Sequence, residues 1–274
     1  MKAEEIRKAV RDRYGSIARE GAEGCGCAPS CCGDEVGVDD VGKAIGYSDD
    51  ELAQVPEDSN LGLGCGNPTA LASLEEGETV LDLGSGAGFD CFLAAEKVGP
   101  TGQVIGVDMT PDMVEKARQN AAKGGFDNVD FRLGEIEALP VADDSVDVII
   151  SNCVLNLSPA RDKVFEEALR ALRPGGRFLI SDLVSDIPPP DFVQNSIDAL
   201  VGCLPVPRDE YLAGLRDAGF QDVEIAEEKS YPVDMVTADP RVQEFLAQHS
   251  DRMGEVVEFI RSVRSASISG TKGA

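Results

Sequence analysis

The sequence is short of basic residues, of long apolar runs and of histidine. Its 274 residues include 25 Lys and Arg against 50 Asp and Glu, and the formal net charge is −25 at pH 7. Such a surface repels nucleic acid and anionic lipid, so we expect neither as a partner. No apolar run approaches the roughly 18 residues that a membrane span requires. The opening segment MKAEEIRKAVRDRYGS is too charged for a secretory signal, which favours a cytoplasmic protein.

Cysteine is plentiful by contrast. The stretch CGCAPSCC, residues 25–32, contains four of the eight cysteines, and the others are Cys65, Cys91, Cys153 and Cys203. In a reducing compartment, clustered cysteines more often bind metals or carry out chemistry than form disulfides. A zinc knuckle is disfavoured because the paired C-x2-C spacing is absent. The one histidine, His249, is expected at the surface, which leaves only carboxylates as general bases.

Strands and helices alternate over the middle of the chain. Short apolar runs predict strands at 78–84, 103–109, 129–135, 146–152 and 177–183. The intervening segments predict helices at 89–99, 111–125 and 159–172. This alternation is typical of βαβ crossovers. It predicts an α/β fold with a doubly wound, mostly parallel, Rossmann-like sheet.

The two flanking regions are less regular. Residues 1–20 predict a helix, residues 21–42 an irregular Cys-rich loop, and Ser48 begins a short helix. After the prolines at 188–190 we expect helices near 191–202 and 208–218, a strand near 222–233, a helix after Pro240 and a frayed end, SISGTKGA. The expected division is therefore an N-terminal helix and Cys-rich region at 1–70, a Rossmann-like domain at 71–187 and a smaller α+β part at 188–274.

The first predicted strand leads into a glycine loop, Asp82-Leu-Gly-Ser-Gly-Ala-Gly. This is not the dinucleotide fingerprint, because Phe89 occupies the place of its last glycine. A loop at a helix N-terminus lets backbone approach a ligand closely, and Asp82 suits a cationic amino group. Asp108 ends the second strand, where a carboxylate can accept ribose hydroxyls, and Glu135 ends the third, where it would face an adenine. Together with the RPGG turn at 173–176, this pattern resembles the class I S-adenosylmethionine methyltransferases.

Three cysteines are expected near that loop. Ligands of open α/β sheets lie outside the carboxyl ends of the strands, where the strand order reverses, and in the class I methyltransferase order that point lies between the first and fourth strands. Cys153 follows the fourth strand, Cys65 lies in the loop LGLGCGNP, and Cys203 follows Gly202. Cys91 is expected in the core. Three thiols without a general base among them suit a methyl-group acceptor that binds to sulfur and has a lone pair of its own.

Longer motifs are more specific. NLGLGCGNP (60–68), VIGVDMTPDM (104–113), GEIEALPVADDSVDVIISNCVLNLSP (134–159) and GCL (202–204) closely resemble the microbial arsenite S-adenosylmethionine methyltransferases. The resemblance implies that Cys65, Cys153 and Cys203 bind trivalent arsenic, and that the domain at 71–187 binds S-adenosylmethionine. It implies a donor site made of Asp82, Gly84, Ser85, Gly86, Gly88, Asp108, Met109, Glu135 and Ile136.

The same resemblance implies a fourth thiol from the Cys31-Cys32 pair. We assign it to Cys32, which would relay arsenic or form a disulfide with Cys65. A disulfide would require a thiol reductant, thioredoxin or a glutathione-like thiol, as co-substrate. Cys25 and Cys27 exceed the expected pair, and they are either further ligands or redundant. Arsenite and its thiol conjugates are the implied substrates.

Two other functions stay open at this point. One is a C- or O-methyltransferase of a small molecule, of the quinone or sterol type, in which replacing the cysteines would have little effect. The other is a thiol-rich metalloid sensor or scavenger, which would bind arsenite without forming a methylated product. All three share the predicted fold, so the chemistry of the thiols distinguishes them.

The acidity predicts that salt stabilises the folded protein. A net charge of −25 destabilises the compact state through self-repulsion, and counterions screen that repulsion. We expect a higher melting temperature in molar KCl than at low ionic strength, as would suit a salt-rich cytoplasm. Thermal unfolding measures this, with an uncharged osmolyte as the control. An unchanged melting temperature in KCl would rule the hypothesis out.

Overall fold

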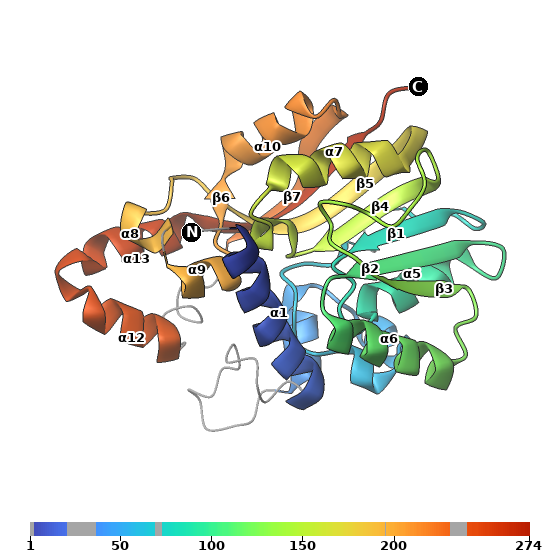
Figure 1. Cartoon of the computed structure of the whole chain (residues 1–274), viewed down its shortest axis with the longest axis horizontal. Coiled ribbons are helices and arrows are strands. Elements are labelled where there is room, and N and C mark those ends of the chain that lie inside the picture. The colour runs from blue at the N-terminus through green and yellow to red at the C-terminus, as the bar shows by residue number, and fades with distance from the viewer. Residues whose placement is uncertain (1–2, 21–36, 69–72, 195, 231–239) are drawn as a thin grey trace.

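The computed structural model describes residues 3–20, 37–68, 73–194, 196–230 and 240–274. One twisted sheet lies at the centre, with helices on both of its faces (Figure 1). Most of the predicted Cys-rich loop falls outside the described residues. So do its four cysteines, Cys25, Cys27, Cys31 and Cys32.

Five parallel strands form most of the sheet, namely β1 (Thr79–Leu83), β2 (Gln103–Asp108), β3 (Val129–Leu133), β4 (Val146–Asn152) and β5 (Leu172–Ser185). The strand order is β3-β2-β1-β4-β5-β8-β7, in which β7 is Gln221–Ser230 and β8 is Val263–Thr271. The short β6 (Val206–Pro207) pairs with β5. The order reverses between β1 and β4, where Leu83 pairs with Ser151. The predicted α/β doubly wound, mostly parallel sheet is confirmed.

Helices cover both faces of the sheet. α7 (Arg161–Ala171) and α10 (Arg208–Asp217) lie on one face, and α5 (Phe89–Val98) and α6 (Pro111–Gly124) lie on the other (Figure 1). The long α1 (Ala3–Glu20) packs against α6 and α9. Along the chain, three short helices follow α1 and precede the first strand, namely α2 (Val38–Ile45), α3 (Asp49–Gln54) and η2 (Glu57–Ser59). Ser48 caps α3, as predicted, by accepting a hydrogen bond from the N–H of Glu51.

A group of short helices extends from one side of the sheet. It comprises α8 (Asp191–Gln194), α9 (Ile197–Val201), α12 (Pro240–Gln248), η4 (Ser250–Arg252) and α13 (Met253–Ser262), at the left of Figure 1. A further short helix, η3 (Leu155–Leu157), follows β4. His249, expected at the surface, is half-buried, and its ring lies 4.4 Å from that of Phe245 and 4.9 Å from that of Phe192.

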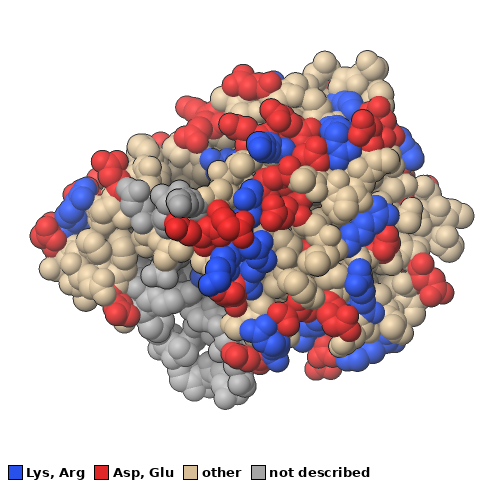
Figure 2. Space-filling view, viewed as in Figure 1, with Lys and Arg blue, Asp and Glu red and all other residues tan. Residues whose placement is uncertain are grey.

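The surface combines an acidic excess with local pairing. Figure 2 shows Asp and Glu spread over the visible face with Lys and Arg beside them. Exposed pairs such as Arg19 with Asp112 and Lys123 with Asp58 lie at 2.6 and 2.7 Å. Because acids are twice as numerous as bases, pairing leaves a large negative excess. Within the described residues, none of the helices has the length and apolar character needed to cross a bilayer.

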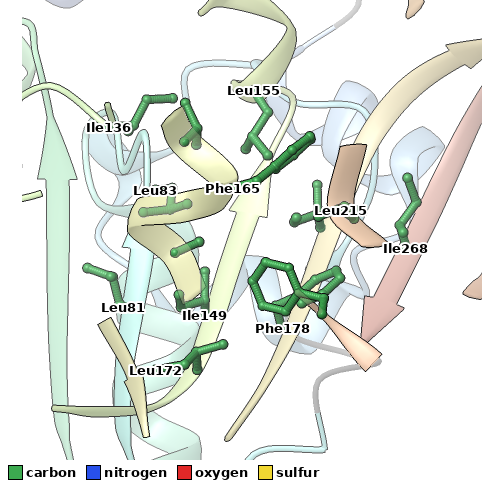
Figure 3. Packing of buried hydrophobic residues seen from close by; sticks show 14 of the residues in the cluster. Leu81, Leu83, Ile136, Ile149, Leu155, Phe165, Leu172, Phe178, Leu215 and Ile268 are labelled. Atoms are coloured by element: carbon green, nitrogen blue, oxygen red, sulfur yellow. The ribbon is translucent and has the colours of Figure 1, made fainter. Parts of the chain in front are cut away.

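The core follows the two-residue period of the strands. Leu81 and Leu83 point to the face covered by α7 and α10, where they join Ile149, Phe178 and Ile268 (Figure 3). Val80 and Val148 point to the other face, where they pack against α5. Each of these side chains is at most 2% exposed. Burial on both faces explains why these strands are continuous apolar runs in the sequence.

The C-terminal residues form a strand, so the predicted frayed end is wrong. β8 (Val263–Thr271) runs antiparallel between β5 and β7 (Gln221–Ser230). Ala266 and Ile268 are fully buried, and Gly270 lies so close to Phe178 that a Cβ would fall 2.6 Å from the ring. The strand is built mainly from Ser, Ala and Gly, whose low hydrophobicity conceals the alternation.

The single helix expected after Pro240 is two, α12 and α13. The division at 70 and 187 stays a prediction.

Truncating Ile268 should test the structural role of β8. Ile268→Ala removes a fully buried side chain from the middle of the sheet, and we expect a loss of about 2–5 kcal/mol in the free energy of unfolding. Urea denaturation measures it. The matched control is Met253→Ala, at a side chain that is 44% exposed, for which we expect a change within about 0.5 kcal/mol. Similar losses in the two variants would contradict the placement of β8.

Candidate functional site

The glycine loop joins β1 to α5. Gly84 and Gly86 have φ of 74° and 52°, in the left-handed region that favours glycine. A Cβ on Gly84 would lie 2.4 Å from Cγ2 of Val154, whereas no atom lies within 4 Å of where a Cβ on Gly86 would be. The loop is therefore packed against the protein at Gly84 and open at Gly86. Among the described residues, the Oγ of Ser85 is buried without a hydrogen-bond partner, which suits a ligand contact.

Three carboxyl groups lie around this loop. Asp108 accepts hydrogen bonds from the backbone N–H of Gly86 at 3.0 Å and of Thr110 at 2.8 Å. Burial raises the pKa of Asp108 and of Asp82, the latter well above its usual range, and it raises the pKa of Asp90 to about 6. Buried acids without a cationic partner are costly. The site therefore favours a ligand that carries positive charge.

Sulfur atoms from three distant segments meet beside the loop. The Sγ atoms of Cys153 and Cys203 lie 3.3 Å apart. The Sγ atoms of Cys65 and Cys153 and a carboxylate oxygen of Asp182 all lie within 4.8 Å of one another. Cys153 and Cys203 have φ of 58° and 65°, a left-handed conformation that costs a residue other than glycine about 1–3 kcal/mol. Strain of this kind is concentrated at functional sites.

Asn152, the last residue of β4, fixes the loop that carries Cys65. Its Oδ1 accepts the Cys65 N–H at 2.9 Å, and its Nδ2 donates to the carbonyl of Gly66 at 2.8 Å and to the hydroxyl of Tyr47 at 2.9 Å. Tyr47 in turn donates to Asp90 at 2.7 Å. This network connects the loop of Cys65 to the first turn of α5, directly after the glycine loop.

The clustered thiols differ in acidity. Hydrogen bonds from Cys203 and Cys65 lower the pKa of Cys153 well below its usual value. The interaction with the Cys153 sulfur raises the pKa of Cys203, and burial raises that of Cys65. Of these three thiols, Cys153 is therefore the one that loses its proton most readily. Cys91 is fully buried in the core, as predicted, and donates to Asp82 at 3.2 Å.

A cavity of about 360 Å³ joins the glycine loop to the thiols, and α1 contributes Val10 and Tyr14 to its wall. It is lined by ten of the predicted site residues, which are Cys65, Asp82, Gly84, Ser85, Gly86, Asp108, Met109, Ile136, Cys153 and Cys203. Two others lie outside the lining. Gly88 is the N-cap of α5, and Glu135 forms ion pairs with Arg7 at 3.4 Å and Arg11 at 3.5 Å. Cys32 lies outside the described residues.

Sequence reasoning missed four residues of this region, namely Tyr47, Asp90, Asn152 and Asp182. A signal was present for three of them. Asp90 lies two residues after the last glycine of the loop, Asn152 precedes Cys153, and Asp182 lies on β5 one residue beyond the partner of Asn152. Tyr47 gives no such signal, because its contact with Asp90 joins residues 43 positions apart.

Comparisons with known proteins agree with this geometry. The Methyltransferase domain family matches residues 74–204. An arsenite methyltransferase of Halobacterium salinarum is 54% identical over 232 residues, which are 81% of this chain and 59% of that protein. An arsenite methyltransferase of Aquipseudomonas alcaligenes is 40% identical over 66% of this chain and 51% of its own length. The chain thus spans between half and three fifths of these two relatives.

A solved structure extends the similarity to the fold. The crystal structure of an arsenic(III) S-adenosylmethionine methyltransferase from Chlamydomonas reinhardtii superposes with a TM-score of 0.62 at 31% identity. The match covers 85% of this chain and 73% of that one. It therefore reaches well beyond residues 74–204, into the segments on either side of the domain.

The buried Asp90 predicts a pH dependence of stability. Because burial raises its pKa from 3.8 to about 6, the folded protein keeps this proton over a pH range in which the unfolded chain has lost it. Stability then falls as the pH rises. Between pH 5 and 7.5 this group should remove on the order of 1 kcal/mol from the free energy of unfolding.

Asp90→Asn should abolish that part of the pH dependence. Urea unfolding of the parent and the variant at the two pH values measures it, with the exposed Asp50→Asn as the control. The difference in stability between parent and variant should change by on the order of 1 kcal/mol between pH 5 and 7.5. A constant difference would show that Asp90 ionises normally in the folded protein.

Proposed function

Because this chain belongs to the arsenite S-adenosylmethionine methyltransferase family, we propose that it transfers the methyl group of S-adenosylmethionine to trivalent arsenic, in arsenite or methylarsenite. One observation carries the proposal. Three sulfurs from distant segments meet at a cavity that also contains the glycine loop. The physiological role that we propose is arsenic detoxification.

The glycine loop is the proposed donor site. When bound, S-adenosylmethionine supplies an electrophilic methyl carbon, to which the lone pair of trivalent arsenic can bond. The unpartnered hydroxyl of Ser85 and the open side of Gly86 fit a ligand here. Asp108 would accept the ribose hydroxyls, and Asp82 would face the ammonium group. Further proposed contacts come from Gly84, Gly88, Met109 and Ile136. Glu135 would act through its ion pairs with α1.

The thiolates of Cys65, Cys153 and Cys203 are proposed to hold trivalent arsenic. Soft thiolates prefer thiophilic centres. Each As–S bond forms as one arsenic hydroxide leaves with the thiol proton as water, so three thiols release three waters and no separate base is required. The lowered pKa of Cys153 provides the first thiolate. Holding the reactants side by side is a mechanism that can supply roughly 7–11 kcal/mol.

A thiol reductant completes the proposed cycle. Formation of the As–C bond formally oxidises arsenic by two electrons, and two thiols can return them as they form a disulfide. We assign the two thiols of this disulfide to Cys65 and Cys32. Thioredoxin or a glutathione-like thiol would then reduce the disulfide. Thiol conjugates of arsenite are proposed as alternative substrates, and the reducing cytoplasm as the compartment.

The direct test is incubation of the full chain with arsenite, S-adenosylmethionine and a thiol reductant, followed by chromatographic speciation of arsenic. We expect methylated arsenic to accumulate with time. Arsenite binding without any methylated product would support a sensor or scavenger instead. Donor-dependent methylation of a small organic molecule, with arsenic left unchanged, would support the alternative methyltransferase function.

Cys153→Ser should abolish arsenic methylation and leave donor binding intact. Because the Cys153 sulfur lies between those of Cys65 and Cys203 and lines the same cavity as the glycine loop, we expect turnover to fall by roughly 100-fold or more. S-adenosylhomocysteine binding, measured by calorimetry, should not change. The matched control is Cys91→Ser, which removes a thiol outside the group and keeps a donor to Asp82. Retained turnover in Cys153→Ser would end the assignment.

A further inference from the structure

We propose that Asp182 and the thiols of Cys65, Cys153 and Cys203 form a binding site for divalent thiophilic cations, Zn²⁺ or Cd²⁺, in which a carboxylate oxygen of Asp182 is the fourth ligand. The proposal does not depend on methyl transfer. It depends on where four donor atoms lie and on how differently arsenic and these cations arrange their ligands.

Three of the four donor atoms are already close to the required spacing, and the fourth, from Cys203, contacts one of them. Those of Cys65, Cys153 and Asp182 lie within 4.8 Å of one another, and the sulfur of Cys203 lies 3.3 Å from that of Cys153. With Zn–S bonds of about 2.3 Å, the sulfurs of a tetrahedral site lie about 3.8 Å apart. Cys65, Cys153 and Asp182 therefore need little rearrangement to bind a cation, whereas the Cys203 side chain, now 3.3 Å from the Cys153 sulfur, would rotate toward the other two donors to complete the tetrahedron. The cavity that the three cysteines line gives it access from outside.

Asp182 has the surroundings of a ligand. It is fully buried, and among the described residues it forms no ion pair. Its Oδ1 accepts hydrogen bonds from Nδ2 of Asn156 at 2.9 Å and from the N–H of Leu183 at 2.8 Å, and its Oδ2 accepts one from Tyr211 at 3.2 Å. Such partners orient metal-binding carboxylates. A carboxylate has about four acceptor positions, so one remains for a cation.

The coordination preferences separate the two kinds of ligand. Trivalent arsenic bonds to three thiolates and keeps a lone pair in the fourth direction, so it has no need of the carboxylate. Zn²⁺ takes four ligands in a tetrahedron from sulfur, nitrogen and oxygen donors. A buried charge is also stabilised when it coordinates a metal. Asp182 should therefore matter for the divalent cation and not for arsenic, and the two should compete for the thiolates.

The test titrates the reduced full chain with CdCl2 and follows the ultraviolet charge-transfer absorption of Cd–thiolate bonds. Every protein in the titration also carries Cys25→Ser, Cys27→Ser, Cys31→Ser and Cys32→Ser. The absorption signal then comes from the cysteines that the structure describes. Loss of a residue that only orients a metal ligand lowers metal affinity about 10–100-fold. Because Asp182 is proposed as a direct ligand, we expect Asp182→Asn to lower the affinity for Cd²⁺ by roughly 100-fold or more. Arsenite binding, measured by loss of titratable thiols, should stay unchanged. The exposed Asp186→Asn is the matched control and should change neither.

Equal Cd²⁺ affinities of the parent and Asp182→Asn would overturn the proposal, and so would a parallel loss of arsenite binding, which would indicate a structural role. If Asp182→Asn does not fold, Tyr211→Phe removes one hydrogen bond to the carboxylate. Tyr211→Phe should then lower the affinity for Cd²⁺ by roughly tenfold. An unchanged affinity would count against the site. Absence of Cd²⁺ binding in the parent would also overturn the proposal, while the methylation assay decides the proposed function independently.

Discussion

The parallel pairing of β1 with β4, at the point where the strand order reverses, brings the glycine loop beside Cys153, and the rest of the site depends on it. The same pairing places Val154 directly against Gly84. A side chain at Gly84 would collide with Val154, so the glycine serves this packing as much as any ligand. The sheet thus holds the glycine loop and Cys153 in a fixed relation.

The site holds unfavourable arrangements that the surrounding structure maintains. Cys153 and Cys203 have left-handed backbones, and the buried Asp82 and Asp90 lie close to each other and to the half-buried Asp108. Hydrogen bonds from Asn152 and Tyr47 keep part of this arrangement in place. Strained residues and crowded acids persist only where neighbouring contacts determine them strongly. A cationic ligand would relieve the crowding of the acids, which agrees with the sulfonium donor that we propose.

Segments far apart in the chain complete the thiol group. Cys203 comes from the end of α9, next to the helical group at the side of the sheet. Ser265 of β8 donates to the carbonyl of Cys65, although the two residues are 200 positions apart. β8 therefore supports the site as well as closing the sheet. Insertion of an antiparallel strand between β5 and β7 gives the C-terminal region a direct role in placing a thiol.

The sequence by itself determined the α/β fold, the glycine loop, the acid that ends β2 and three of the thiols, because strand periodicity and strand-end positions are local features. It also carried the resemblance that the comparisons bear out. Only the tertiary structure decided the network of Tyr47, Asn152 and Asp90, the place of Asp182 beside the sulfurs, and the strand β8. Those features arise from contacts between distant residues, and small side chains such as those of β8 leave no hydrophobic pattern from which pairing can be inferred.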